Sequence, residues 1–241
     1  MLELKQVKMK LFFIRHGQST NNLLWTENNS EDSRVEDPTL TPTGKQQANL
    51  AGVYIKDVLI PSEITLDSEH ITLYCSLMIR AVETGCVISR ELGQPIFAYP
   101  DIHEIGGIYL EDETQGEKIG LEGKQRSYFL ENFPELVTPE NWPGTGWWNK
   151  RFENRQMAYS RAKRVLNTLM QLHPDDAEVV FLVSHAGFYN AFIKTIIGIG
   201  EQNSIWFELN NVAISAMEIT VNHHVLNFCN RFEYLPSELR T

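Results

Sequence analysis

Cysteine is scarce in this chain of 241 residues. Cys75, Cys86 and Cys229 are odd in number and have neither a Cys-x-x-Cys pair nor zinc-ligand spacing. This usage is typical of reduced intracellular thiols rather than of a disulfide framework, so we expect a cytoplasmic protein. Long hydrophobic runs are also missing. The apolar stretch near the start, residues 11–14, is far too short for a signal peptide or a membrane span, and we expect no membrane partner.

Basic residues are fewer than acidic ones. The chain has 21 Lys and Arg against 31 Asp and Glu, which gives a net charge of −10. This balance argues against a nucleic-acid partner, because phosphate backbones are held by basic faces. A few arginines can still make one cleft positive, so a small anionic substrate remains compatible. The chain has no glycine-rich dinucleotide motif, no P-loop and no cluster with metal-ligand spacing. We therefore expect neither a cofactor nor a metal ion.

The composition that is present, 42% hydrophobic and 22% charged residues, is typical of a soluble globular protein with a substantial core. No repeat or long linker divides residues 1–241, which predicts a single domain. Apolar runs at residues 11–14, 71–75 and 178–184 predict buried strands, each followed by a segment with helical spacing. Residues 212–219 and 225–229 predict a closing hairpin. The pattern predicts a three-layer α/β/α fold with a mainly parallel sheet.

Two local signals support this pattern. Thr41-Pro42 predicts the start of a helix, with threonine as the cap and proline in the first turn. A second helix is expected over residues 188–197, directly after the run at 178–184.

Residues 105–155 break the alternation of strands and helices. They are rich in polar residues, Gly and Pro, and contain Trp142, Trp147 and Trp148. A structureless loop of that length is unusual in a compact domain, so we expect a helical insertion, with one helix near residues 127–133, beside the active-site cleft. Two roles remain open for it. Its aromatic residues can anchor the insertion by packing, or they can bind the substrate together with cations. The cations in question are Lys124, Arg126 and Lys150.

Three predicted strands end at polar residues, in Arg15-His16, in the segment from Ser76 to Arg80, and at His185. Ligands of parallel sheets bind at the carboxyl ends of the strands, so these side chains should meet in one crevice. Arginine offers a fork of donors that matches phosphate oxygens, and a neutral imidazole can attack phosphorus. Backbone N–H groups at Gly17 and at Ala186, just before the next predicted helix, can add to an anion site.

Four segments, in the same order along the chain, resemble those of the histidine phosphatase superfamily, the phosphoglycerate-mutase-like proteins. They are Leu-Phe-Phe-Ile-Arg-His-Gly-Gln-Ser-Thr-Asn-Asn at 11–22, Leu-Thr-Pro-Thr-Gly-Lys-Gln-Gln-Ala at 40–48, Ser-Leu-Met-Ile-Arg-Ala-Val-Glu-Thr at 76–84 and Val-Ser-His-Ala-Gly at 183–187. Any one of them is a weak signal, whereas the set is specific. The resemblance does not extend to residues 105–155.

The resemblance implies that His16 is the nucleophile and forms a phosphohistidine. It implies that the phosphate pocket is made by Arg15, Asn22, Arg80 and the second catalytic histidine, His185. Asn22 rather than Asn21 stands six residues beyond the nucleophile, as in the family.

The resemblance also implies a general acid, a carboxylate soon after the strand that is third in the family. Glu104 fits the family's Leu-x-Glu pattern, with Ile102 in the Leu position. One carboxyl can protonate the leaving alkoxide and later take a proton from water, so the chemistry also calls for such a residue. Asp101 is the competing candidate.

These observations predict a metal-independent phosphomonoester hydrolase, a phosphatase that acts on a small phosphorylated metabolite. One alternative is a phosphoglycerate-mutase-type phosphotransferase. The family's mutases have Trp where Asn21 stands, and a basic residue directly after the acid, where this chain has Ile105. Both departures favour the hydrolase. The alternative from another class is a non-catalytic module that binds a phosphorylated ligand. The sequence leaves the oligomeric state open, with a homodimer among the options.

Overall fold

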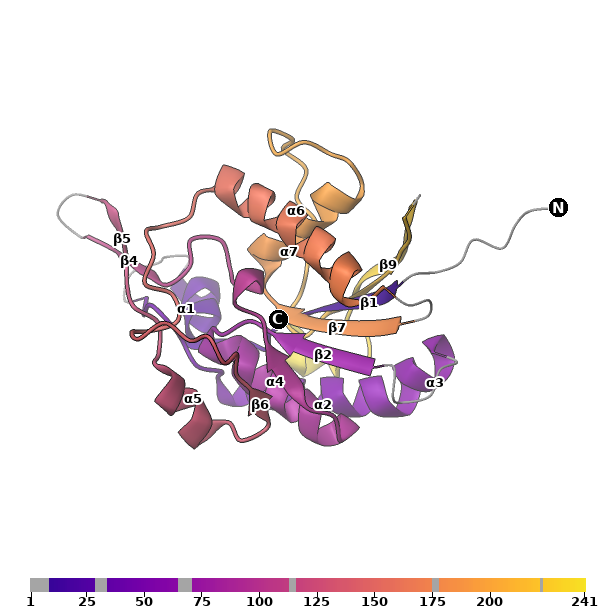
Figure 1. The fold of residues 1–241 in the computed structure, drawn as a ribbon. Helices are drawn as coiled ribbons and strands as arrows, with labels where there is room; N and C mark the ends of the chain where they lie inside the picture. The colour runs from indigo at the N-terminus through magenta and orange to yellow at the C-terminus, as the bar shows by residue number, and fades with distance from the viewer. Residues whose placement is uncertain (1–8, 29–33, 65–70, 113–115, 175–177, 222) are drawn as a thin grey trace.

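The computed structural model describes residues 9–28, 34–64, 71–112, 116–174, 178–221 and 223–241. A seven-stranded sheet runs through the middle of the molecule, in the order β6-β3-β2-β7-β1-β8-β9 (Figure 1). The strands from β6 to β1 are parallel, whereas β8 is antiparallel to β1 and to β9. The strands are β1 (Met9–Arg15), β2 (Ile71–Cys75), β3 (Ile96–Ala98), β6 (Leu136–Val137), β7 (Glu178–Ser184), β8 (Ile214–Ile219) and β9 (His224–Arg231).

Helices cover both faces of this sheet, which confirms the predicted three-layer α/β/α fold with a mainly parallel sheet. One face carries α2 (Pro42–Tyr54), α3 (Ile60–Glu63) and α4 (Ile79–Leu92). The opposite face carries α6 (Arg155–Leu172) and α7 (Ala186–Ile196) (Figure 1).

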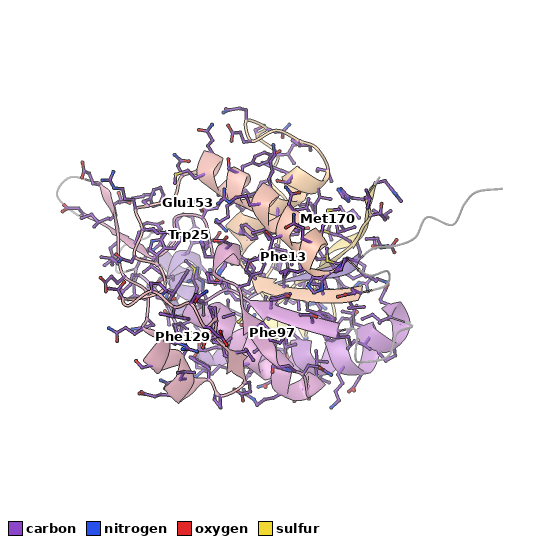
Figure 2. All side chains as sticks on the ribbon, viewed as in Figure 1. Phe13, Trp25, Phe97, Phe129, Glu153 and Met170 are labelled. Carbon is purple, nitrogen blue, oxygen red and sulfur yellow. The ribbon has the colours of Figure 1, made fainter. Side chains whose placement is uncertain are left out.

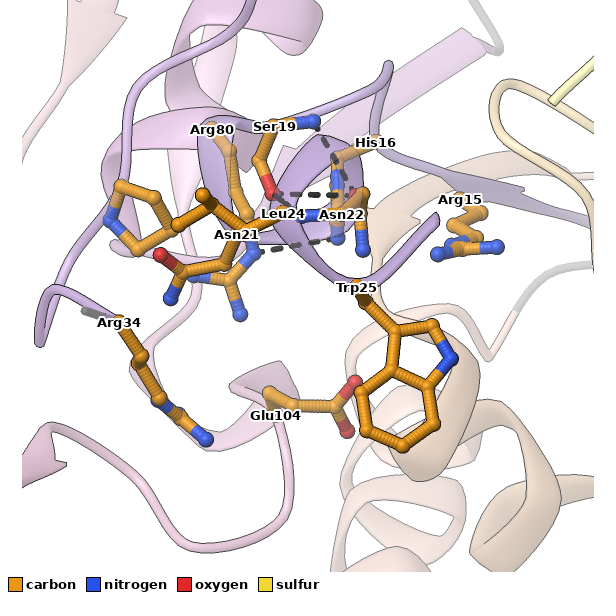
Figure 3. Close-up of a pocket in the computed structure, with 11 residues that line it drawn as sticks. Arg15, His16, Ser19, Asn21, Asn22, Leu24, Trp25, Arg34, Arg80 and Glu104 are labelled. Atoms are coloured by element: carbon orange, nitrogen blue, oxygen red, sulfur yellow. Dashed lines mark hydrogen bonds between the residues drawn. The ribbon is translucent and has the colours of Figure 1, made fainter. Parts of the chain in front are cut away.

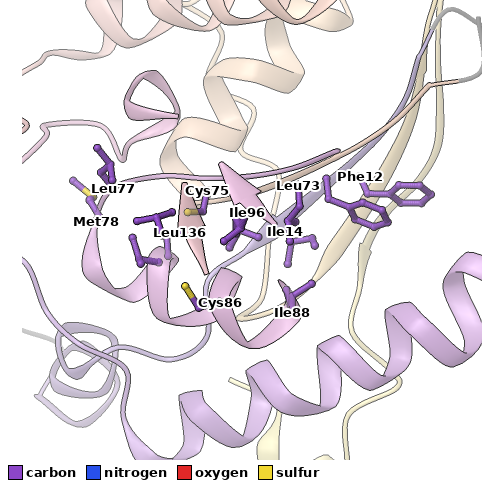
Figure 4. Close-up of a cluster of buried hydrophobic side chains, with 14 of the residues drawn as sticks. Phe12, Ile14, Leu73, Cys75, Leu77, Met78, Cys86, Ile88, Ile96 and Leu136 are labelled. Carbon is purple, nitrogen blue, oxygen red and sulfur yellow. The ribbon is translucent and has the colours of Figure 1, made fainter. Parts of the chain in front are cut away.

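Two hydrophobic cores lie between these layers, because alternate side chains of each buried strand point to opposite faces. On β1, Phe12 and Ile14 join the core beneath α4, where Phe12 stacks on Phe181 with ring centroids 4.8 Å apart (Figure 4). Phe13 joins the other core, under α6 and α7, and contacts Phe188 (Figure 2). Residues on both faces are therefore apolar, as the unbroken hydrophobic runs predict.

Several local predictions are confirmed. Thr41 caps α2, because its Oγ1 accepts a hydrogen bond from the Gly44 N–H at 3.0 Å. The hairpin of β8 and β9 closes the sheet. The helix after β7 begins at Ala186, two residues earlier than predicted. A further helix, α1 (Thr20–Asn28), was not predicted.

The insertion is not purely helical, so this part of the prediction is wrong. It contains α5 (Arg126–Asn132), close to the expected helix, but also an antiparallel pair of β4 (Tyr109–Glu111) and β5 (Lys118–Gly120). In addition, β6 pairs with β3 and extends the main sheet. These strands have two or three residues each, too few for alternation to reveal them. Trp147 and Trp148 are buried in the same core as Phe12 and Ile14, so these two residues pack against the domain, as the first of the two roles requires.

Within the described ranges, no helix is both long enough and apolar enough to cross a membrane.

Candidate active site

A cavity of about 200 Å³ opens at the carboxyl end of β1 (Figure 3). Its walls come from the end of β1, from α1, from residues 34–38, from the start of α4 and from the loop after β3. The lining residues are Arg15, His16, Ser19, Asn21, Asn22, Leu24, Trp25, Arg34, Pro38, Arg80 and Glu104. Five predicted site residues are therefore brought together here, namely Arg15, His16, Asn22, Arg80 and Glu104.

His16 lies at the base of this cavity with a defined tautomer. Its Nδ1 lies 2.7 Å from the carbonyl oxygen of Gly17, which can only accept, so Nδ1 carries the hydrogen. Nε2 accepts a hydrogen bond from Nε of Arg80 at 3.1 Å (Figure 3). Burial, followed by the charges of Arg80 and Arg15, lowers the pKa of His16 well below its ordinary value of 6.5. His16 is therefore a neutral imidazole whose Nε2 lone pair faces a cation.

Two buried arginines supply that positive charge. Burial lowers the pKa of Arg15 to about 10, so it stays charged at neutral pH. Its Nη1 donates to the carbonyl of Leu209 at 2.7 Å, which fixes the side chain. Arg80 also has a pKa lowered mainly by burial, and it has a carboxylate nearby. Nη1 of Arg80 lies 4.0 Å from Oδ1 of Asp37, whose own pKa burial raises to about 6.

Asn22 is oriented by neighbours on both sides. Its Oδ1 accepts hydrogen bonds from the N–H of Ser19 at 3.1 Å and from the Ser19 hydroxyl at 3.0 Å. Nδ2 of Asn211 also donates to this oxygen, at 3.4 Å. With its oxygen engaged in this way, the side-chain NH₂ of Asn22 is the group that can donate into the cavity.

His185 lies directly behind His16 rather than in the cavity wall. The two rings are 5.1 Å apart between centroids, and His185 is fully buried. Its Nε2 lies 2.9 Å from the hydroxyl of Ser76, the residue that follows β2. Among the described residues, Nδ1 of His185 has no hydrogen-bond partner. Burial, followed by the charge of Arg80, lowers its pKa well below 6.5, so this ring is neutral too.

Glu104 is seated on the N-terminus of α7. Its Oε1 accepts hydrogen bonds from the N–H groups of Ile105 at 2.8 Å and Phe188 at 2.9 Å, and its Oε2 accepts one from Gly187 at 3.1 Å. A Cβ at position 187 would overlap this carboxylate, so glycine is required for the close approach. Asp101 instead lines a separate cavity, which favours Glu104 as the carboxyl of this site.

Several backbone amides near the predicted anion site have protein partners. The N–H of Gly17 donates to Oγ1 of Thr84 at 3.0 Å, and those of Gly187 and Phe188 hold Glu104. Neither Gly17 nor Ala186 belongs to the described lining of the cavity. The Gly17 donor is therefore occupied by a side-chain hydroxyl, which argues against its part in an anion site, whereas the part expected of the Ala186 amide stays a prediction.

The cations of the insertion are not among the described residues that line the cavity. Lys124 and Lys150 lie over the rings of Tyr128 and Trp148, and Nε of Arg126 donates to Oγ1 of Thr138 at 3.0 Å. The insertion instead supports the cavity through Tyr109, whose hydroxyl accepts from Nη1 of Arg34 at 2.7 Å.

The sequence analysis missed several lining residues: Ser19, Asn21, Leu24, Trp25, Arg34 and Pro38. Asp37, the carboxylate beside Arg80, was missed as well. Four of these missed residues lie on or next to α1, which has no clear apolar face. The one local signal there is the Ser19 hydroxyl, which accepts from the Asn22 N–H at 3.3 Å, as in a helix cap.

The described residues contain no group of three or more His, Cys, Asp or Glu side chains that could hold a metal ion.

Comparison with known proteins agrees with this geometry. The model of the histidine phosphatase superfamily (branch 1) matches residues 11–231. No curated protein matches the sequence. A mutant phosphoserine phosphatase from Entamoeba histolytica, in complex with phosphoserine, has 22% identity and a TM-score of 0.60, covering 95% of this chain and 100% of its own. A putative alpha-ribazole-5'-P phosphatase from Escherichia coli has 17% identity and a TM-score of 0.61, covering 92% and 96%. The alpha-ribazole phosphatase of Shigella flexneri has 19% identity, the same TM-score and the same coverage.

These structural likenesses establish the fold, and the family model spans all four motifs together with the insertion. The chain belongs to branch 1 of the histidine phosphatase superfamily.

Proposed function

We propose that this protein is a phosphomonoester hydrolase that works through a covalent phosphohistidine at His16. The observation that carries the proposal is the state of that side chain. A neutral imidazole, with its hydrogen fixed on Nδ1 and its Nε2 lone pair at the base of a cavity, is a nucleophile ready for phosphorus. Arg15 and Arg80 stand beside it and match the charge of a phosphoryl group.

In the first step, Arg15, Arg80 and the Asn22 amide hold the non-bridging oxygens of the phosphoryl group, while His185, packed behind His16, supports the ring of the nucleophile. Arg80 then moves its hydrogen bond from Nε2 of His16 to the phosphoryl oxygens, which frees the lone pair. Nε2 attacks phosphorus, the bond between phosphorus and the ester oxygen breaks, and that oxygen leaves with a proton from Glu104. The products are phosphohistidine and the free alcohol.

In the second step, Glu104 takes a proton from water as the water oxygen attacks phosphorus and the bond to Nε2 breaks. Inorganic phosphate leaves, and His16 and Glu104 return to their starting states. Each carboxylate oxygen has about two acceptor sites. Oε1 of Glu104 already accepts two N–H groups and Oε2 accepts one, so Oε2 is the atom we assign to the proton transfers.

The cavity, about 200 Å³ in volume, suits a small phosphorylated metabolite. The solved structures named above include a phosphoserine phosphatase and alpha-ribazole phosphatases, and their names agree with hydrolysis of a small phosphate ester. We further propose that the two arginines provide the positive charge for the reaction and that no metal ion takes part.

A labelling experiment tests this proposal. The protein is mixed with a ³²P-labelled phosphate ester, quenched, and assayed for label that survives alkali but not acid, as phosphohistidine does. We expect label on the wild type, none on His16→Ala, and release of inorganic phosphate at a rate that a strong chelator leaves unchanged. Isomerised ester in place of inorganic phosphate would favour the mutase, and a folded protein that neither takes label nor releases phosphate would favour the non-catalytic binding module.

A further inference from the structure

A buried ion pair lies behind the segment that carries Glu104. Arg161, on α6, is 2% exposed and is paired with Glu153, which Figure 2 labels near the start of that helix. Nε and Nη2 of Arg161 donate to Oε1 and Oε2 of Glu153 at 2.8 and 2.5 Å. This two-pronged geometry fixes the plane of the guanidinium and leaves Nη1 directed at the backbone.

Nη1 of Arg161 binds the chain immediately before Glu104. It donates to the carbonyl oxygens of Asp101 at 2.7 Å and His103 at 3.0 Å. The carbonyl between them, that of Ile102, accepts from the hydroxyl of Ser184 at 2.6 Å. Three consecutive carbonyls are therefore held before the chain reaches Glu104, two of them by one guanidinium.

The same pair also contacts the other supports of Glu104. The Arg161 guanidinium lies 4.5 Å from the ring centroid of Phe188, whose N–H donates to Oε1 of Glu104. The N–H of Glu153 donates to the carbonyl of Gly106 at 3.3 Å, just after Glu104. Arg161 is not among the described residues that line the catalytic cavity, so it acts on the reaction indirectly, and its hydrogen bonds lead to the segment that carries Glu104.

A buried ion pair is a costly way to stabilise a fold, because both charges lose their hydration. Fixing a reacting group is a different matter, since a displacement of about 1 Å can cost about 10²-fold in rate. We propose that Arg161, aligned by Glu153, is a positioning residue that sets the place of the Glu104 carboxyl for proton transfer. This inference rests on the proposed hydrolase function and assigns how its acid is held.

The kinetic test uses Arg161→Lys, which keeps the charge but loses the planar fork. Alkyl phosphates need a proton on the leaving oxygen, whereas aryl phosphates with acidic phenols do not. We expect kcat on an alkyl phosphate to fall at least ~10-fold and kcat on the aryl phosphate to change less than ~3-fold. In a Glu104→Gln background the same change should add less than ~3-fold on either substrate, because the two residues act as one unit. Arg164→Lys, one turn along α6 and exposed, is the matched control.

A second measurement does not depend on turnover. The amides of Ile105, Gly187 and Phe188 are bonded to the Glu104 carboxylate. We expect Arg161→Lys to speed their hydrogen exchange selectively, whereas amides in β1 stay protected. If Arg161→Lys does not fold, Glu153→Gln, which keeps the shape and removes the charge, is measured in the same way.

Three results would overturn the inference: equal losses on both substrates, full additivity with Glu104→Gln, or unchanged exchange at the three amides. A wild type without phosphatase activity would contradict the proposed function alone, and the exchange data would still decide the role of Arg161.

Discussion

Nε of Arg80 lies 3.1 Å from Nε2 of His16 and donates a hydrogen bond to the lone pair of the expected nucleophile. When substrate binds, its phosphoryl oxygens can accept hydrogen bonds from the same guanidinium in place of His16. Without ligand, this hydrogen bond holds the imidazole in the orientation needed for attack. The charge of Arg80 also lowers the pKa of His16. A proton on Nε2 would remove the lone pair that attacks phosphorus. In the proposed mechanism, Arg80 thus has two roles, since it binds the phosphoryl group and disfavours a proton on the nucleophile.

Replacing Arg80 should therefore change the titration of His16. Arg80→Met removes a positive charge from its surroundings, so we expect the pKa of His16 to rise towards 6.5, although burial still holds it below that value. Histidine ring signals followed by NMR between pH 4 and 8 provide the measurement. Arg90→Met, an exposed position on the same helix that pairs with Glu135, should leave the titration unchanged. A fall in the His16 pKa in Arg80→Met would contradict the proposed electrostatics.

The second prediction separates Glu104 from Asp101 as the acid. Glu104→Gln keeps an oxygen for the backbone donors but cannot transfer the proton. General acid catalysis contributes about 10²–10⁴-fold, so kcat on an alkyl phosphate should fall by about that factor, and kcat on an activated aryl phosphate much less. Asp101→Asn, at a side chain that lines another cavity, should leave both rates near those of the wild type. The reverse pattern would make Asp101 the acid.

A third prediction concerns stability against pH. His16, His103 and His185 each have a pKa well below 6.5, chiefly because burial disfavours the charged ring. Below pH 6.5 the unfolded chain binds protons that the folded protein does not, so the free energy of unfolding should fall as the pH falls. The loss reaches at most about 1.4 kcal/mol per pH unit for each histidine. Urea unfolding at pH 7.5, 6.5 and 5.5 measures it.

Asp37 acts in the opposite direction and provides a control. Its pKa is raised to about 6 in the fold, so between pH 6 and 4 the folded protein takes up a proton before the unfolded chain does. Proton uptake by Asp37 stabilises the folded protein and partly offsets the loss of stability that the histidines cause. Asp37→Asn should therefore make the loss of stability steeper below pH 6. A shallower loss of stability in Asp37→Asn would contradict the raised pKa of Asp37. A wild type that gains stability between pH 7.5 and 5.5 would contradict the lowered pKa values of the histidines.

The sequence predicted those parts of the site that lie at the ends of buried strands. His16, Arg80 and Glu104 stand next to apolar runs or inside recognisable motifs, so their meeting point follows from parallel topology. The site's outer wall could not be predicted in this way. Trp25 and Arg34 lie in segments without hydrophobic periodicity, and their places depend on tertiary contacts such as the one between Arg34 and Tyr109.

Dependence on tertiary contacts also explains why the sequence could not show which backbone amides are already bonded, nor what the residues of the insertion contact. No local pattern shows that Glu104 occupies the N–H groups at the start of α7, because that contact joins residues more than 80 positions apart. Nor does spacing reveal that Lys150 lies over Trp148 instead of at the cavity. The sequence left packing and substrate contact open for the cationic and aromatic residues of the insertion, and the contacts of Trp147, Trp148 and Lys150 are packing contacts.

The last prediction concerns substrate choice, which we expect to depend on the cavity wall rather than on the packed residues of the insertion. Trp25 lines the cavity yet is 53% exposed, so the fold gains little from its ring, whereas a bound substrate can cover it. Trp25→Ala should raise KM for the best phosphate ester several-fold and leave kcat and the thermal midpoint nearly unchanged, because contacts far from the reacting bond contribute mainly to binding. Trp206→Ala is the matched control, since Trp206 is also 53% exposed but lines a different cavity. Lys150→Gln should likewise have no effect on KM. A rise in KM for Lys150→Gln but not for Trp25→Ala would mean that the insertion selects the substrate. Equal effects of Trp25→Ala and Trp206→Ala would mean that the ring of Trp25 makes no specific contact with the substrate.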